Sequence, residues 1–168
     1  MTVENLIQEK IKELLQSIAN SIPVEWDDLY VNVEMANDGG SIYFDFKSSD
    51  DEKYHYSLSI PNDFSIDSTI FSQLNNQQFE ISRELWEIFT RHNMATWSRA
   101  IILFVNGKLD VKFDYAPWME STYGPTTRRN FFKYQYLGFQ PRTEKEDSLF
   151  KEMEEFQKKF QRLIKLKK

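Results

Sequence analysis

Apolar residues near the start of the chain recur every three or four positions, with charged residues between them. This spacing places the apolar side chains on one face of an amphipathic helix over about residues 3–20. Pro23 follows, and proline ends helices because it lacks an N–H donor and restricts the residue before it. The apolar face consists of Leu6, Ile7, Ile11, Leu14, Leu15, Ile18 and Ile22.

The hydrophobic period then changes to two, which predicts strands at about residues 29–35, 42–46 and 54–60. The first two are separated by the turn sequence Asn37 to Gly40, whose glycines tolerate the positive φ of hairpin loops. A polar loop around Asp50 to Glu52 separates the second strand from the third. These short connections indicate an antiparallel meander with one wetter face.

A second helical pattern extends from about residue 70 to residue 92, and Asn75-Asn76 weakens its middle, so it indicates one helix or two. A very apolar run, Trp97 to Val105, and an alternating run, Lys108 to Tyr115, come next. Asn106-Gly107 between them is the strongest hairpin signal in the chain. We therefore expect a second pair of antiparallel strands after the helical region.

The rest of the chain predicts two more helices. Pro125 suits the first turn of one helix and Gly138 suits its C-terminal stop. Thr143 and Glu146 form a capping box for a last helix over about residues 143–166. The complete pattern predicts an α+β fold: a single antiparallel sheet of about five strands, with helices packed on one face.

Composition favours one globular domain spanning residues 1–168, because 40% of the residues are apolar and 15% are aromatic. The formal charge of −5 conceals a division: residues 21–120 carry 17 acidic and 7 basic side chains, and residues 121–168 carry 6 and 12. An acidic body repels nucleic acids and membrane phosphates and attracts basic partners. The polar first ten residues, and the lack of an apolar run of about 20 residues, lead us to expect a cytoplasmic protein with no membrane partner.

Most catalytic chemistries find no support in the sequence. There is no cysteine, which excludes disulfides, thiolate nucleophiles and Cys-ligated metal sites. His55 and His92 are far apart and lack the spacing of a metal site or a catalytic triad. All five glycines belong to predicted turns or helix ends, so none remains for a phosphate-binding loop. We expect no cofactor, no bound metal and no catalytic residue.

Two short motifs keep an enzymatic alternative open. Asp45–Lys47 and Asp110–Lys112 each read Asp-x-Lys on a predicted strand, which points both charged side chains to one face. The spacing resembles a strand motif of metal-dependent nucleases, in which the acid holds Mg²⁺ and the lysine steadies the attacking water. A solvated strand face with alternating charges gives the same spacing, and an acidic body opposes phosphate binding. The acidic run Asp50 to Glu52 lacks the twelve-residue loop of an EF-type Ca²⁺ site.

A series of motifs spread over nearly the whole chain points to a known family. They are Ile22 to Trp26 with Tyr30, Asp38 to Gly40, Tyr56 with Ile60-Pro61, Trp97, Phe113 to Tyr115 with Trp118, Tyr123-Gly124, Arg129, Tyr134, and Gly138 to Pro141. In this order they resemble the YezG/EsaG-like antitoxins, the immunity proteins of Gram-positive bacteria. The resemblance implies a cytoplasmic, non-catalytic protein that binds and neutralises a polymorphic toxin, typically a nuclease domain exported by a specialised secretion system.

The acidic body agrees with that implied role, because a nuclease cleft is basic and an acidic inhibitor is attracted to it. We therefore predict partner contacts at acids of the sheet rim and loops, with one tryptophan beside them. The predicted partner-binding residues are Asp27, Asp28, Asp38, Asp45, Asp50, Asp51, Glu52, Asp110, Asp114, Trp118 and Glu120. Two alternatives remain: an adaptor that binds another basic protein, and the Mg²⁺-dependent nuclease. The basic segment Lys158 to Lys168 matches no family motif and leaves self-association open.

Overall fold

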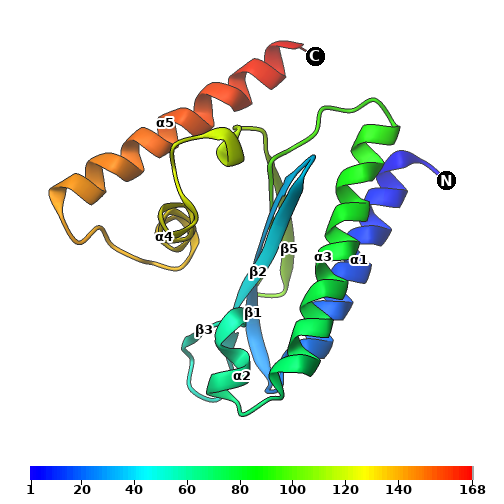
Figure 1. The fold of residues 1–168 in the computed structure, drawn as a ribbon, viewed down its shortest axis with the longest axis vertical. Helices are drawn as coiled ribbons and strands as arrows, with labels where there is room; N and C mark the ends of the chain where they lie inside the picture. Colours follow the sequence, from blue (N-terminus) through cyan, green and yellow to red (C-terminus); the bar gives the residue numbers. More distant parts are fainter. Residues whose placement is uncertain (168) are drawn as a thin grey trace.

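The computed structural model describes the backbone of residues 1–167 and the side chains of residues 1–161. Five strands form one antiparallel sheet in the order β3-β2-β1-β4-β5 (Figure 1). This arrangement confirms the predicted α+β class and the five-stranded antiparallel sheet. In chain order the elements are α1 (Val3–Ser21), β1 (Trp26–Ala36), β2 (Gly39–Ser48), β3 (Tyr54–Tyr56), the 3₁₀ turn η1 (Ser57–Ser59), α2 (Ile60–Asp63), α3 (Ser68–Arg91), β4 (Arg99–Val105), β5 (Lys108–Asp114), the 3₁₀ turn η2 (Trp118–Glu120), α4 (Pro125–Tyr136) and α5 (Glu144–Lys167).

Helices α1 and α3 lie side by side on one face of the sheet (Figure 1). Helix α3 begins at its N-cap Asp67, whose carboxylate accepts the N–H groups of Thr69 and Ile70. It then runs through Asn75-Asn76 as a single helix. Apolar residues at alternate strand positions and at helical spacing meet in one core, whose fully buried members include Leu14, Ile18, Val31, Val33, Phe44, Leu85 and Ile102.

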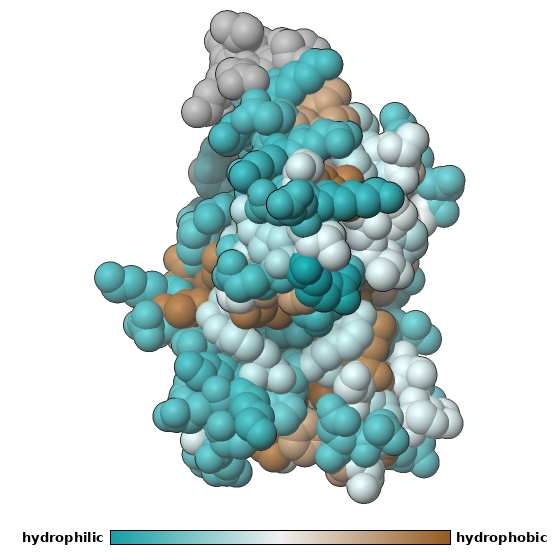
Figure 2. All heavy atoms as spheres, turned by 90° about the vertical axis from the view of Figure 1, so that its left-hand side faces the viewer, coloured by the Kyte–Doolittle hydropathy of each residue, from teal (hydrophilic) through white to brown (hydrophobic). Residues whose placement is uncertain are grey.

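The opposite face of the sheet is also covered, by α4 and α5 (Figure 1). The sequence predicted helices on one face only and a wetter opposite face, and Tyr30, Asn32 and Glu34 of β1 share the strand face opposite Val31 and Val33. All three are buried in the structure, so the predicted wet face of β1 is wrong. Figure 2 shows that the outer surface of α4 and α5 is mostly hydrophilic, which agrees with their apolar side chains pointing inward.

The third strand is much shorter than its alternating pattern predicts. Pairing with β2 ends at Tyr56, because the next residue, Ser57, accepts the N–H of Phe44 with its side-chain Oγ at 3.0 Å. The chain then turns through η1 into α2, where Ile60 is buried in the core. No helix in the described part of the chain combines the length and apolar character needed to cross a membrane.

Gly40 offers a test of the β1–β2 hairpin. A Cβ added there would lie 2.2 Å from the carbonyl oxygen of Glu34, so we expect Gly40→Ala to lower the free energy of unfolding by about 1–3 kcal/mol in urea denaturation. Gly124→Ala is the control, because its Cβ would meet no atom within 4 Å and its φ is −76°. The control should lose less than about 1 kcal/mol, and equal losses would contradict the steric argument.

Candidate partner-binding surface

Three of the predicted contact residues lie inside the protein. Asp45, Asp114 and Trp118 are exposed by only 2%, 2% and 1%. All three belong to the side of the sheet that α4 and α5 cover. Contrary to the sequence prediction, these side chains are therefore not on the surface that the fold presents to a partner.

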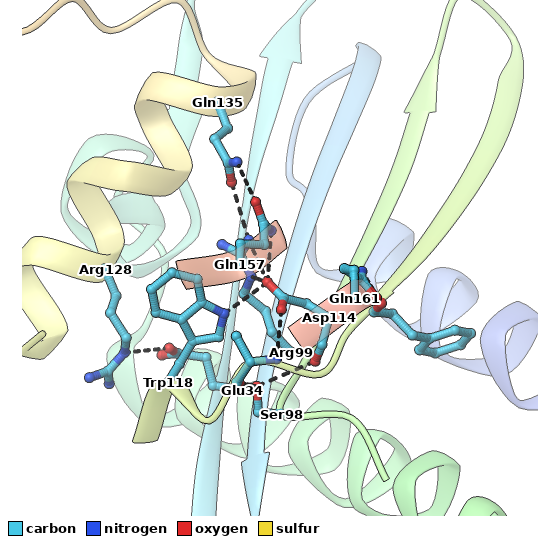
Figure 3. Close-up of polar contacts among 11 residues, drawn as sticks. Glu34, Ser98, Arg99, Asp114, Trp118, Arg128, Gln135, Gln157 and Gln161 are labelled. Carbon is cyan, nitrogen blue, oxygen red and sulfur yellow. Dashed lines mark hydrogen bonds and ion pairs between the residues drawn. The ribbon is translucent and has the colours of Figure 1, made fainter. Parts of the chain in front are cut away.

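Asp114 is the centre of a buried hydrogen-bond network (Figure 3). Its Oδ2 accepts from Arg99 Nε at 3.1 Å, from Trp118 Nε1 at 2.8 Å and from Gln157 Nε2 at 2.8 Å. Its Oδ1 accepts the N–H of Ala116 at 3.1 Å. One carboxylate therefore joins β4, η2 and α5 to the end of β5.

Two consecutive arginines of α4 make the other buried ion pairs. Arg128 Nε lies 2.6 Å from Glu34 Oε2 (Figure 3), and Arg129 binds both oxygens of Asp45 at 2.6 and 2.7 Å. The Arg129 guanidinium also lies 3.9 Å from the ring centre of Tyr56. Burial raises the pKa of Asp45, and the hydrogen bonds from Arg129 oppose that rise. These pairs fix α4 on the sheet, and we call them, with Arg99–Asp114, the buried ion-pair layer.

A second group of acids belongs to three segments that meet at one end of the sheet, the lower end in Figure 1. Hydrogen bonds connect three segments there: Ser49 Oγ donates to Asp27 Oδ1 at 2.9 Å, and the N–H of Asn106 donates to Asp28 Oδ1 at 3.1 Å. The start of β1, the β2–β3 loop and the β4–β5 turn are thereby held together. We define the exposed and half-exposed carboxylates of this region, Glu25, Asp27, Asp28, Asp50, Asp51 and Glu52, as the acidic end.

The β2–β3 loop is the most prominent part of the acidic end. Asp51 accepts the N–H of Lys53 at 2.9 Å and lies 2.8 Å from His55 Nε2. The N–H of Lys53, followed by His55, holds the pKa of Asp51 below its usual range. Asp51 therefore stays charged at neutral pH, and its neighbours Asp50 and Glu52 are exposed.

Cations and exposed apolar groups also lie near the acidic end. Lys47, Lys53 and Lys108 belong to the same region of the sheet, which therefore contains three lysines beside its six acidic residues. Tyr54, directly after the loop, is 44% exposed, and Leu58 is 52% exposed. This combination, a net negative rim with large apolar side chains beside it, is typical of protein-binding surfaces.

The other predicted acids do not join this region. Asp38 lies in the β1–β2 turn at the opposite end of the sheet, and Glu120 ends η2 near Asn37 at that same end. Asp110 lies along β5, with its carboxylate 3.7 Å from Lys112 Nζ. The structure thus groups Asp27, Asp28 and the Asp50–Glu52 loop, and separates them from Asp38, Asp110 and Glu120.

The two Asp-x-Lys motifs do not form a common site. Asp45 is on β2 and Asp110 is on β5, with β1 and β4 between them in the sheet. Both oxygens of Asp45 are already held by Arg129. Within the described residues, no group of three or more Asp, Glu or His side chains has the arrangement needed to hold a metal ion.

Comparison with known proteins identifies the family. A family model described as an immunity protein, YezG-like, matches residues 7–151. The chain belongs to the YezG-like immunity protein family. It is 29% identical over 162 residues to the type VII secretion system protein EsaG of Staphylococcus aureus, covering 96% of this chain and 99% of that protein. It is 28% identical over 138 residues to the immunity protein YezG of Bacillus spizizenii, covering 79% of this chain and 86% of that protein. The family predicted from the sequence motifs is therefore confirmed.

Some of the residues that carry the family resemblance lie in or beside the buried ion-pair layer. Asp114, Trp118 and Arg129 all belong to them, and all three are held inside the protein or against its sheet. The YezG-like motifs at these positions therefore maintain the fold. The acidic end consists of other residues, which are exposed or half-exposed, and it is the candidate surface for contact with a partner.

Asp114→Asn tests the importance of this layer. Loss of the charge leaves Arg99 buried without its ion-pair partner, so we expect the free energy of unfolding to fall by about 3–5 kcal/mol. Urea denaturation followed by far-UV circular dichroism measures the change. Asp38→Asn makes the same chemical change at an exposed turn and should cost no more than about 0.5 kcal/mol. A loss for Asp114→Asn as small as that of the control would contradict the role assigned to Asp114.

Proposed function

We propose that this protein neutralises a cognate toxin without catalysis, by binding it through the acidic end of the sheet. The observation that carries the proposal is the grouping of six carboxylates from separate segments at one end of a rigid sheet. Membership of an immunity protein family supports a toxin as the partner. The name of the Staphylococcus aureus relative, a type VII secretion system protein, supports a toxin exported by a specialised secretion system.

A basic nuclease domain is the toxin that best complements this surface. Nucleases bind phosphates, and their clefts are therefore positively charged. Carboxylates clustered within about one Debye length (~8–10 Å) act together on an approaching cation, which accelerates association. Once bound, the acidic end would occupy the path of the nucleic acid, and Tyr54 and Leu58 would supply apolar contact beside it. Inhibition then needs only binding, which agrees with an immunity role in the cytoplasm before the toxin is exported or when it enters.

A charge reversal at the acidic end tests this mechanism. In Asp50→Lys/Glu52→Lys the two changed side chains are exposed, and Asp51 stays because its carboxylate holds the loop. We expect association with the cognate toxin to slow by about tenfold at low salt and to lose most of its salt dependence. Stopped-flow or surface-plasmon measurements at two salt concentrations give the rates, and a nuclease assay gives the inhibition.

Asp38→Lys/Glu120→Lys is the matched control, because it changes the net charge equally at the opposite end of the sheet. It should leave the association rate within about twofold of the wild type. Equal slowing by both variants would mean that net charge alone acts, and an unchanged rate in the Asp50/Glu52 variant would remove this loop from the interface. Mg²⁺-dependent DNA cleavage by the purified protein, lost in Asp110→Ala, would contradict a purely non-catalytic role.

A further inference from the structure

Strand β5 is the long open edge of the sheet. The other edge strand, β3, has three residues, whereas β5 has seven. Among the described residues, β5 pairs with β4 and no strand lies on its other side. Such an edge presents unpaired N–H and C=O groups to any strand that approaches it.

The hydrogen bonds show which residues of β5 face this edge. The N–H of Ser98 donates to the carbonyl of Asp114 at 2.9 Å, so Asp114 faces the β4 side. The carbonyl of Phe113 instead accepts Gln161 Nε2 at 3.1 Å, from α5 (Figure 3). Because successive residues alternate in an antiparallel ladder, Leu109, Val111 and Phe113 present their backbone groups to the open edge.

An apolar groove runs along the same edge on the α1 side of the sheet. It has a volume of about 620 Å³ and is lined by Ile7 and Ile11 of α1 and by Leu109, Val111 and Phe113 of β5, with polar side chains at its rim. Leu109 is 50% exposed within it. An edge strand with exposed apolar side chains is normally covered.

The sequence of β5 is complementary to itself when reversed. Lys108 to Asp114 reads Lys-Leu-Asp-Val-Lys-Phe-Asp. In an antiparallel pair centred on Val111, Asp110 stands opposite Lys112, and Leu109 stands opposite Phe113. Opposite charges and apolar pairs in these positions stabilise a sheet. Shifting either strand so that Asp110 faces Asp110, or Lys112 faces Lys112, places like charges together and is disfavoured.

We propose that the β5 edge binds the β5 edge of a second copy of this chain, antiparallel and centred on Val111. The two sheets then form one continuous sheet across a two-fold axis, as in isologous dimers. The backbone geometry agrees, because Val111 opposite Val111 and Leu109 opposite Phe113 bring edge-facing groups together. The carbonyl of Phe113 has two lone pairs, so its bond from Gln161 does not prevent a second one. The same pairing covers the groove and assigns Asp110 to a contact between copies.

Sedimentation of the full chain over a range of concentrations tests the proposal. We expect a dimer in the wild type. Asp110→Lys should weaken dimerisation by about tenfold, because two new like-charge contacts with Lys112 arise across the axis. The exchange Asp110→Lys/Lys112→Asp should restore dimerisation, since opposite charges face each other again. Both side chains are more than half exposed, so neither variant should impair folding, which circular dichroism checks.

Val111→Pro gives an independent test of the backbone pairing. It removes an N–H that faces the open edge and leaves the bonds to β4 in place, so a folded monomer is expected. A wild type that is monomeric at all concentrations would overturn the proposal. A dimer that survives Val111→Pro would also overturn it. The same holds for a dimer that Asp110→Lys weakens and that the charge exchange fails to restore. A monomeric wild type whose toxin complex is lost in Val111→Pro would assign this edge to the toxin instead.

Discussion

The fold depends on satisfying a carboxylate that has no access to water. Asp114 is buried at the end of β5, and a charge in that position is tolerated only when donors surround it. Those donors come from Arg99 on β4, Trp118 in η2 and Gln157 on α5. Elements distant in the sequence must therefore assemble together, and the bond from Gln157 to this carboxylate helps to position α5. The adjacent apolar cluster of Trp118, Phe131, Phe150 and Met153 completes the attachment.

The ion-pair layer also changes the meaning of the charge distribution. Glu34, Asp45 and Asp114 contribute to the acidity of residues 21–120, yet each is paired with an arginine inside the protein. Two of those arginines, Arg128 and Arg129, belong to the basic part of the chain after residue 120. Part of the apparent charge division is therefore cancelled internally by folding. The acids that remain on the surface of residues 21–120 include the six of the acidic end, and others lie on α3 and in the remaining turns.

Sequence periodicity predicted the order of helices and strands, because repeats of two and of three to four residues report local burial. It could not predict that both faces of the sheet are covered. The partner of Glu34 is Arg128, 94 residues later, and the partner of Asp45 is Arg129, 84 residues later. A carboxylate at an alternating strand position looks the same in the sequence whether its hydrogen-bond partner is water or a distant arginine. For the same reason three predicted contact residues proved to be internal, while the loop acids, whose neighbours are polar and close in sequence, lie on the surface as their pattern indicates.

Coverage of both sheet faces also limits where a partner can bind. In β1, every side chain from Leu29 to Met35 is buried. Neither face of the central sheet is therefore open to another protein. The ends and edges of the sheet remain, together with the outer surfaces of the helices. One end carries the acidic loops, and one edge carries the self-complementary strand β5. Their chemistries differ: the end offers charge to a basic surface, and the edge offers backbone bonds to an extended strand. The proposed dimer and the proposed toxin contact therefore rely on different groups: the backbone N–H and C=O groups of β5 in one case, and the carboxylates of loops and strand ends in the other.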